Sequence, residues 1–526
     1  MLSQIKSVVV VFALSGIGLF IFYNCLKPAT RAEFGRAPIA FALATPVIFF
    51  LAPGLYAVLA LSALMIPMLA RTPAQAAGLY VMGAMMMPSV NFNLSVAGAY
   101  ITNVSTHLLF GLSAILVTMS KGDKRLSSRP YDLPFLLLLS AIALMTLRAD
   151  TATGMLRGVF SLTVSLIIPY LVVSRAIRSR DDASRVLLHL ACAGVVIGIV
   201  LIFESARHWP LYADHIQATT EIAAASTAKM RGGMLRAAGP VGEPMPMSVY
   251  MLAGTIACLA TRAAFRSPIH WLGLVGIAAY GMLMPQSRNA VLGLAIAVTV
   301  YFLYRGQFAT LAKLGVVGGG LYAVMQVATG KNPIPFMSEP GLGGEDYRTS
   351  LFYRGMEEFW KSPIIGRPVA AVLADMQDMV QGEGIVDFVN GYLYIGLLAG
   401  GIGLALFAAM LFFAYSRLLA VRNKVIRDAE VSSLVGFQVA GLTAIAVMHA
   451  FIGTESIMSV LILLLSYVAT AKLAMTARDL SPLVDDDATS SSREASTPAV
   501  AGGMPIRDLI AQPPMRDIGG LPSLRS

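Results

Sequence analysis

Apolar runs of about membrane length recur along this chain and are separated by short polar stretches. A run of ~17–25 mostly apolar residues is enough to cross a bilayer as a helix. Pro53 and Gly54 divide the 37–70 stretch, which is too long for one crossing. The predicted spans are 7–26, 37–52, 54–70, 76–93, 101–119, 132–147, 153–174, 183–203, 247–263, 269–285, 288–304, 310–328, 391–415, 432–450 and 453–473. We therefore predict an all-α, polytopic transmembrane helix bundle of about fourteen or fifteen spans.

The composition supports a membrane protein. Of 526 residues, 56% are hydrophobic and only 13% are charged, and the mean hydropathy is +0.71, so lipid must cover much of the apolar surface. The three cysteines form no Cys-x-x-Cys motif, which argues against a zinc or redox enzyme; we expect no metal and no cofactor. The net charge of +10 lies mainly in short loops, so it does not indicate nucleic-acid binding.

The positions of the charges predict the orientation. Three short basic loops, 121–129, 175–185 and 417–427, are expected in the cytoplasm. Alternation then places two long loops in the periplasm: 204–246 and the larger, helical 329–390. The membrane domain covers 1–473, and its first apolar run is a retained helix because no cleavage site follows it. The tail, 474–526, is rich in Ser, Pro, Gly and Ala, and we expect it to be cytoplasmic and disordered.

Several arginines are predicted near the outer face. They are Arg148, Arg157, Arg236, Arg288, Arg348 and Arg354. A guanidinium stays charged and can grip phosphate oxygens with two parallel hydrogen bonds, so together they suit a lipid-borne phosphate or diphosphate. Arg236 and Arg288 also lie beside helix starts, where free N–H groups favour an anion. The alternative for each arginine is an interfacial anchor that reaches lipid headgroups.

The stretch 346–362 has the pattern of an amphipathic helix, which Pro363 should end. Its apolar face carries Leu351, Phe352, Met356, Phe359 and Trp360. Such a helix could lie on the membrane and cap a cavity, or could simply pack in the periplasm. The soluble-enzyme motifs GxGxxG, Walker lysine, HExxH and GxSxG do not occur.

Four elements resemble, in order, those of a known family. They are LRAAGPVGEP (235–244), PQSRNAVLGL (285–294), YRTSLFYRGMEEFWKSPIIG (347–366) and VNGYLYIGLLAGGIGL (389–404). They are similar to the Arg-x-x-Gly, Ser-Arg, periplasmic-helix and His-Asn elements of the O-antigen ligase and polymerase superfamily. These bacterial membrane proteins transfer glycans from undecaprenyl diphosphate. The resemblance covers roughly residues 230–470.

Two positions bear on which branch of this superfamily the chain resembles. Val389 stands where ligases carry a histidine proposed to activate the acceptor hydroxyl, and valine cannot take a proton. GTESIMSVLILLL (453–465) resembles the final span of exopolysaccharide polymerases, where a Glu-Ser pair opens the helix. The resemblance therefore favours a polymerase over a ligase. The chain departs from the family at Glu243, Pro244 and Met245, where Asn-Pro-Asn is frequent.

The resemblance implies a glycosyltransferase at the outer face of the bacterial inner membrane. It would polymerise undecaprenyl-diphosphate-linked oligosaccharide repeat units, with inversion and without a metal, in exopolysaccharide or O-antigen synthesis. Arg236 and Arg288 would hold the diphosphate as catalytic residues, and Arg348 or Arg354 would close over it. The candidate bases are Glu455, which we favour, Asp387, Glu383 and His449. The implied partners are the lipid-linked glycan, the bilayer, a flippase, and chain-length or export proteins, with no nucleic acid.

Three other functions stay open at this point. An O-antigen ligase would transfer the glycan to a lipid A-core acceptor. A flippase or transporter for the lipid-linked oligosaccharide would also need arginines, but along a path through the membrane. The gathering of arginines on one face favours an enzyme, because His107 and His189 are nearly the only titratable groups deep within spans. A structural assembly subunit would tolerate replacement of the arginines.

Overall fold

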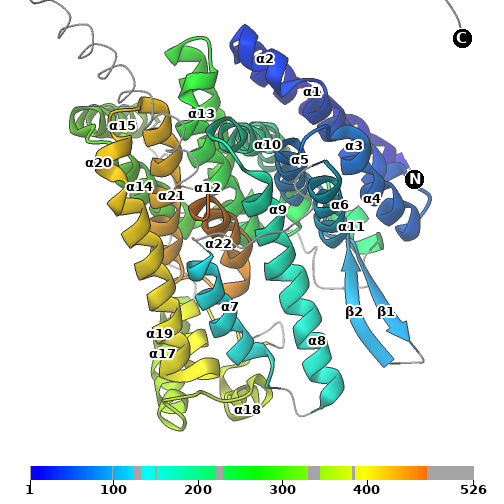
Figure 1. The fold of residues 1–526 in the computed structure, drawn as a ribbon, viewed down its shortest axis with the longest axis vertical. Helices are drawn as coiled ribbons and strands as arrows, with labels where there is room; N and C mark the ends of the chain where they lie inside the picture. Colours follow the sequence, from blue (N-terminus) through cyan, green and yellow to red (C-terminus); the bar gives the residue numbers. More distant parts are fainter. Residues whose placement is uncertain are drawn as a thin grey trace, which may run out of the picture. The chain divides into compact units, whose positions relative to one another are not determined.

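The computed structural model describes residues 2–96, 99–121, 132–148, 151–219, 229–231, 233–329, 344–381 and 385–470. The chain is an all-α, polytopic helix bundle, as predicted, and every predicted span overlaps a helix (Figure 1). The helices are α1 (Leu2–Cys25), α2 (Pro28–Phe34), α3 (Ala37–Leu51), α4 (Leu55–Leu69), α5 (Pro73–Met86), α6 (Thr106–Lys121), α7 (Leu133–Thr146), α8 (Ala152–Leu162), α9 (Ile168–Ala176), α10 (Arg180–Arg207), α11 (Ala213–Thr219), α12 (Pro244–Ala260), α13 (Pro268–Leu283), α14 (Arg288–Tyr304), α15 (Phe308–Thr329), α17 (Gly344–Trp360), α18 (Val369–Asp375), α19 (Gly391–Ala420), α20 (Arg422–Val425), α21 (Ala429–Met448) and α22 (Thr454–Val468). The predicted tail, 474–526, lies outside the described residues.

Many helices begin at a side-chain cap, which explains where the apolar runs become helical. Ser179, for example, forms a reciprocal capping box with Asp182 at the start of α10. At the start of other helices a single side chain accepts a hydrogen bond from the backbone of the first turn; these residues are Thr72, Thr151, Ser267, Ser287, Asn390 and Asp428. The first N–H groups of a helix have no partner within it, so a nearby hydroxyl, amide or carboxylate fixes the first turn.

Among the described residues, five helical segments are long and apolar enough to cross a membrane. A sixth results if α2 and α3, bent by 54° at their junction, count as one span. Shorter apolar helices of 10–17 residues make up most of the rest. At 1.5 Å per residue a 15-residue helix is about 22 Å long, less than the ~30 Å hydrocarbon core. The total of fourteen or fifteen spans therefore stays a prediction.

The centre of the bundle is packed through glycines. Helices α10 and α21 are buried along most of their length. A Cβ on Gly281 of α13 would lie 2.4 Å from the Cα of Gly198 on α10, and one on Gly194 would lie 3.0 Å from the Cα of Gly254 on α12. Only residues without a side chain allow backbones to approach so closely, as at many helix contacts in membranes.

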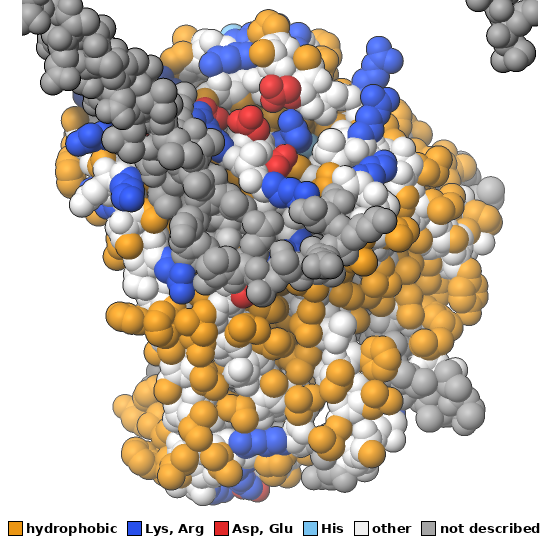
Figure 2. Space-filling model, viewed as in Figure 1, with side chains coloured by type: hydrophobic (Ala, Val, Ile, Leu, Met, Phe, Trp, Pro, Cys, Tyr) orange, Lys and Arg blue, Asp and Glu red, His pale blue; other side chains and the backbone are white. Residues whose placement is uncertain are grey.

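One end of the bundle, here called the basic face, carries ion pairs from the predicted cytoplasmic loops. Arg180 pairs with Asp428 (Nη1–Oδ2, 3.0 Å) and with Glu430, which joins the 175–185 loop to the start of α21, directly after the 417–427 loop. Arg175 pairs with the buried Asp132 (Nη2–Oδ2, 2.7 Å). In Figure 2 charged side chains gather at this upper end of the visible face, and hydrophobic side chains dominate its middle.

The opposite end, here called the loop face, carries residues 204–219, 229–231, 233–244, 284–288, 362–381 and 385–391. The start of α1 lies at this face too, since Gln4 Nε2 and His215 Nδ1 are 3.2 Å apart. The candidate site residues that the structure describes belong to the loop face or its neighbouring helix ends. That this face is periplasmic stays a prediction.

Residues 91–105 correct the predicted ends of two spans. The structure has an antiparallel hairpin of β1 (Asn91–Val96) and β2 (Ala99–Ser105) where spans 76–93 and 101–119 were expected to end and begin (Figure 1). The physical reason is the alternation of polar and apolar residues in NFNLSV, which has the period of a strand. A second, shorter hairpin joins β3 (Met230–Arg231) and β4 (Met234–Leu235).

The predicted span 391–415 is also corrected, because α19 reverses direction at Gly400. This residue has φ 62° and ψ −161° inside an otherwise helical stretch. The rings of Tyr392 and Phe407 lie 5.7 Å apart, whereas fifteen residues of straight helix would separate them by about 22 Å. The segment before Gly400 therefore folds back beside the segment after it.

The connection between α17 and α18, residues 361–368, supplies the backbone hydrogen bonds that this reversal frees. They are Gly401 N to Pro363 O (2.7 Å), Ile402 N to Ile364 O (3.1 Å) and Arg367 N to Leu397 O (2.9 Å). Non-helical backbone at membrane depth is tolerated only where protein or a cavity satisfies it. These three bonds thus hold the connection 361–368, at the loop face, against α19.

Candidate functional site

A buried carboxylate fixes the loop that carries Arg236. Glu204, in the last turn of α10, is 1% exposed. Its two oxygens accept hydrogen bonds from the backbone N–H groups of Leu211 (2.9 Å) and Gly239 (3.0 Å). Burying a carboxylate is costly unless such bonds compensate it, so these contacts hold the loop in one conformation over the helix end.

The Arg236 loop lies directly on the turn that precedes Arg288. Arg236 Nε donates to Pro285 O (3.0 Å), and Arg231 Nη1 donates to Gln286 O (2.9 Å). Arg288 is the first residue of α14, next to the capping residue of that helix. Two arginines predicted from separate motifs, Arg236 and Arg288, are thus brought into neighbouring elements.

The turn itself is strained. Gln286 has φ 54°, in the left-handed region that few residues other than glycine adopt, and it is 4% exposed. Its side-chain amide donates to Leu235 O (3.4 Å), and Ala237 N donates to Met284 O (3.1 Å). Such outliers persist only where surrounding contacts determine them, and they gather at functional sites.

Positive charge dominates this part of the loop face. Burial, and next to it the charge of Arg231, lowers the pKa of Arg236, while Glu243 opposes the shift. Glu243 also pairs with Lys229 (3.1 Å). Arg236 stays charged despite the shift because a guanidinium loses its proton only far above neutral pH. An anion bound here would relieve this repulsion.

The turn between α21 and α22 joins the same region. Asn289 Nδ2 donates to Phe451 O (3.1 Å), and Gly391 N donates to His449 O (2.8 Å). The His449 ring is 1% exposed and stacks on Phe407, with centroids 5.1 Å apart. The geometry favours a packing role for His449 over its predicted role as a base.

A cavity of about 470 Å³, here called the Asp387 cavity, lies where these elements meet. Met245, Asp387, Val389 and Thr454 are among its lining residues. Asp387 is exposed, and its backbone N–H and carbonyl both bond the Tyr347 hydroxyl at 3.2 Å. Val389 therefore opens into this cavity, with the carboxylate of Asp387 two residues away.

A larger cavity of about 770 Å³, here called the Arg148 cavity, adjoins it. Both cavities are lined by Val369, Tyr394 and Thr454. Among the described residues that line the two cavities, the arginines are Arg148 and Arg157, so Arg236 and Arg288 line neither.

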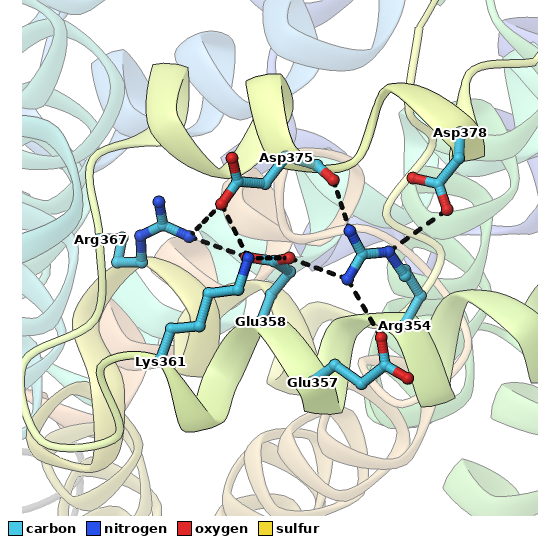
Figure 3. Close-up of polar contacts among 7 residues, drawn as sticks. All are labelled: Arg354, Glu357, Glu358, Lys361, Arg367, Asp375 and Asp378. Carbon is cyan, nitrogen blue, oxygen red and sulfur yellow. Dashed lines mark hydrogen bonds and ion pairs between the residues drawn. The ribbon is translucent and has the colours of Figure 1, made fainter.

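Helices α17 and α18 are joined by a network of charges (Figure 3). The Glu358 carboxylate is fully buried and pairs with Arg354 (2.9 Å), Lys361 (2.6 Å) and Arg367 (2.8 Å). Hydrogen bonds from Lys361 and Arg367 lower the pKa of Asp375 to about 2. This network holds the predicted periplasmic helix α17 against α18.

The network changes the interpretation of Arg354. Besides Glu358, this guanidinium contacts Glu357 (3.1 Å) and Asp378 (3.3 Å). Burial alone would lower its pKa, but Asp378 and Glu358 raise it above the ordinary value. The charge of Arg354 is therefore balanced by three neighbouring carboxylates. This argues against the prediction that Arg354 closes over a diphosphate. Arg348 is exposed near the start of α17.

The amphipathic prediction for this helix is met only in part. Leu351 is buried, and Gly355 packs directly on Leu393 of α19. Phe352 and Trp360, predicted on the same apolar face, are 47% and 68% exposed. One side of α17 is thus packed on the bundle and another carries exposed aromatic rings.

Two of the candidate bases cannot be placed. Glu383 and the side chain of Glu455 lie outside the described residues. Arg148 and Arg157 were predicted near the outer face but were not among the residues predicted to hold the diphosphate. The feature of the sequence that could have identified them is their position on either side of the short turn between the predicted spans 132–147 and 153–174.

Among the described residues, no group of three or more His, Cys, Asp or Glu side chains is placed to hold a metal ion. No family model matches the chain, and no curated protein matches it.

Proposed function

We propose that the protein is a membrane glycosyltransferase that polymerises undecaprenyl-diphosphate-linked oligosaccharide repeat units at the outer face of the bacterial inner membrane. The observation that carries the proposal is the meeting of the motif-bearing segments at one end of the bundle. Hydrogen bonds join Arg236 to the turn before Arg288, join Asn289 to the α21–α22 turn, and join Gly391 to His449 at the start of that turn. Segments 235–244, 285–294 and 389–404 thus contact one network although they are far apart in the chain.

The Arg236 and Arg288 region is the proposed diphosphate site. The diphosphate of the donor glycan carries its charge on oxygens that a guanidinium can bind in pairs. When the bond from the anomeric carbon to the diphosphate breaks, negative charge develops on the departing oxygen. Fixed cations stabilise that charge more in the transition state than in the ground state.

The acceptor hydroxyl attacks the anomeric carbon and must lose its proton to a base. The proposed base is Asp387, a carboxylate that lines the Asp387 cavity together with Met245, the residue directly after the 235–244 segment. Glu455 follows Thr454, which lines the same cavity, and stays a second candidate. The new C–O bond forms as undecaprenyl diphosphate leaves with the electron pair of the old one.

The test uses the full-length protein in liposomes with undecaprenyl-diphosphate-linked repeat units. We expect a ladder of longer glycans and release of undecaprenyl diphosphate. Asp387→Asn should lower kcat about 10²–10⁴-fold with little change in KM if it is the base. Glu455→Gln should do so if the base is Glu455 instead. Arg236→Ala and Arg288→Ala should weaken both donor binding and turnover.

The control is Arg207→Ala, an exposed arginine at the end of α10 that belongs to no proposed site. It should leave the ladder unchanged. Transfer of glycan only to a lipid A-core acceptor would indicate a ligase, and movement of the lipid without bond formation would indicate a flippase. An Arg288→Ala protein as active as Arg207→Ala would contradict the proposed diphosphate site.

A further inference from the structure

The Arg148 cavity has a lining of mixed character. Arg148 and Arg157 supply positive charge, and the hydroxyls of Thr146, Ser161 and Ser165 lie among apolar side chains. Its volume, about 770 Å³, falls in the range of small-molecule sites, roughly 300–1,000 Å³. The described lining residues include no aspartate or glutamate. A ligand suited to this lining carries an anionic group, several hydroxyls and some apolar surface.

Three structural features build this cavity. Gly158 lets α8 approach the end of α7, because a Cβ there would lie 2.9 Å from Thr146 O. Arg157 is thereby held near the end of α7, which Arg148 follows. Arg148 Nη1 donates to Leu398 O (3.3 Å), a carbonyl just before the reversal of α19. Broken helices whose ends face a cavity are typical of ligand sites in membrane proteins.

A π-helix, η1 (Thr163–Ile167), lies at the same place and is an independent sign of function. It joins α8 to α9 and contributes Ser165 and Leu166 to the lining. Single π-turns within α-helices are rare and are frequent at functional sites. Ser165 and Ser459 also line a second cavity of about 230 Å³, so the two cavities are neighbours.

We propose that the Arg148 cavity binds the phosphorylated sugar head of a second lipid, with Arg148 and Arg157 on the phosphate oxygens. The assignment of that lipid as the acceptor repeat unit rests on the proposed function, since polymerisation joins two lipid-linked glycans. The acceptor sugar would reach the Asp387 cavity past Val369, Tyr394 and Thr454, which line both spaces. Donor and acceptor phosphates would thus be held by separate arginine pairs.

An anionic phospholipid of the bilayer offers the same phosphate chemistry, so the test must distinguish the two sources. Native mass spectrometry of the full-length protein in detergent counts bound undecaprenyl diphosphate directly. We expect two molecules on the wild type and one on Arg148→Ala/Arg157→Ala. The remaining molecule, held at Arg236 and Arg288, shows that this variant is folded. Each lost arginine should weaken the second site on the order of tenfold.

Matched variants show which arginine pair holds each bound undecaprenyl diphosphate. Arg236→Ala/Arg288→Ala should also bind one molecule, and Arg207→Ala should bind two. Arg148→Lys/Arg157→Lys keeps the charge but loses the planar fork, so we expect partial recovery of the second molecule. Two molecules on Arg148→Ala/Arg157→Ala with unchanged affinity would overturn the second site and leave the proposed function intact.

Two further results separate the claims. If Arg236→Ala/Arg288→Ala still binds two molecules while Arg148→Ala/Arg157→Ala binds one, the cavity is supported and the proposed donor site fails. If phosphatidylglycerol displaces the second undecaprenyl diphosphate at equal concentration, the assignment to the acceptor is overturned. Displacement only at large excess supports it.

Discussion

Replacing Gly400 with alanine tests the account of the α19 reversal. The conformation at Gly400, φ 62° and ψ −161°, is essentially open to glycine alone. A Cβ on this residue would lie 2.4 Å from the carbonyl carbon and oxygen of Ile364 and 2.6 Å from Gly366 N. These are backbone atoms of the connection between α17 and α18. An alanine must therefore push the connection away from α19.

The size of the effect follows from two terms. The backbone conformation costs an alanine about 1–3 kcal/mol. Displacing the connection also breaks the three backbone hydrogen bonds that it makes with α19, each worth about 1 kcal/mol net. We expect Gly400→Ala to lower the free energy of unfolding by about 4–6 kcal/mol.

Two other glycines separate these terms. Gly54 has φ 105° and ψ 172°, a similarly restricted conformation, but no atom lies within 4 Å of its Cβ position. Gly54→Ala should therefore cost only about 1–3 kcal/mol. Gly276, inside α13, has neither a positive φ nor a close neighbour. Gly276→Ala should be neutral or stabilise by up to about 1 kcal/mol.

The assay is unfolding of the purified full-length protein in mixed detergent micelles, with increasing sodium dodecyl sulfate, followed by tryptophan fluorescence. Trp360 reports on the region that Gly400→Ala should disturb, because it ends α17 next to the connection. The order of stability should be Gly276→Ala, then Gly54→Ala, then Gly400→Ala. If Gly400→Ala were no less stable than Gly54→Ala, the contact between the connection and α19 would be refuted.

Two further predictions concern charged groups. Asp132→Asn removes the partner of the buried Arg175 and should cost about 3–5 kcal/mol in the same unfolding assay, whereas Asp181→Asn, at an exposed position, should change little. The bonds from Lys361 and Arg367 lower the pKa of Asp375 from 3.8 to about 2. The stability they confer is complete above about pH 4 and is lost as the pH falls towards 2, so limited proteolysis of 344–381 should accelerate only below about pH 3. Acceleration already near neutral pH would contradict this assignment.

The helices could be predicted from the sequence because a bilayer demands long apolar runs with internal hydrogen bonding. Two features could not be predicted from hydropathy. At the β1–β2 pair, only the alternation of polar and apolar residues in β1, NFNLSV, distinguishes a strand from the end of a helix. The reversal at Gly400 depends on hydrogen bonds from a connection more than thirty residues earlier in the chain.

The candidate site was predictable in its residue types more than in its contacts. Arg236 and Arg288 lie in neighbouring elements, as the motif order implied. The ion pairs of Arg354 with Glu357 and Glu358 have the i,i+3 and i,i+4 spacing of neighbours on the predicted helix, so the sequence carried a signal for them. The contact of Arg354 with Asp378 had no such signal, because only folding brings the two segments together. Arg148 donates to Leu398 O, next to the reversal of α19, although the two residues are 250 positions apart. The pattern of residues along the chain does not predict a contact over such a separation.

The central claim is tested most directly in the host cell. The gene is deleted, and the lipid-linked glycans and surface polysaccharide are analysed after complementation with wild type, Arg288→Ala or Asp387→Asn. We expect single repeat units to accumulate on undecaprenyl diphosphate at the outer face and long polymer to disappear, with recovery only by the wild type. Long polymer that remains on the lipid carrier, or repeats trapped at the cytoplasmic face, would contradict a polymerase.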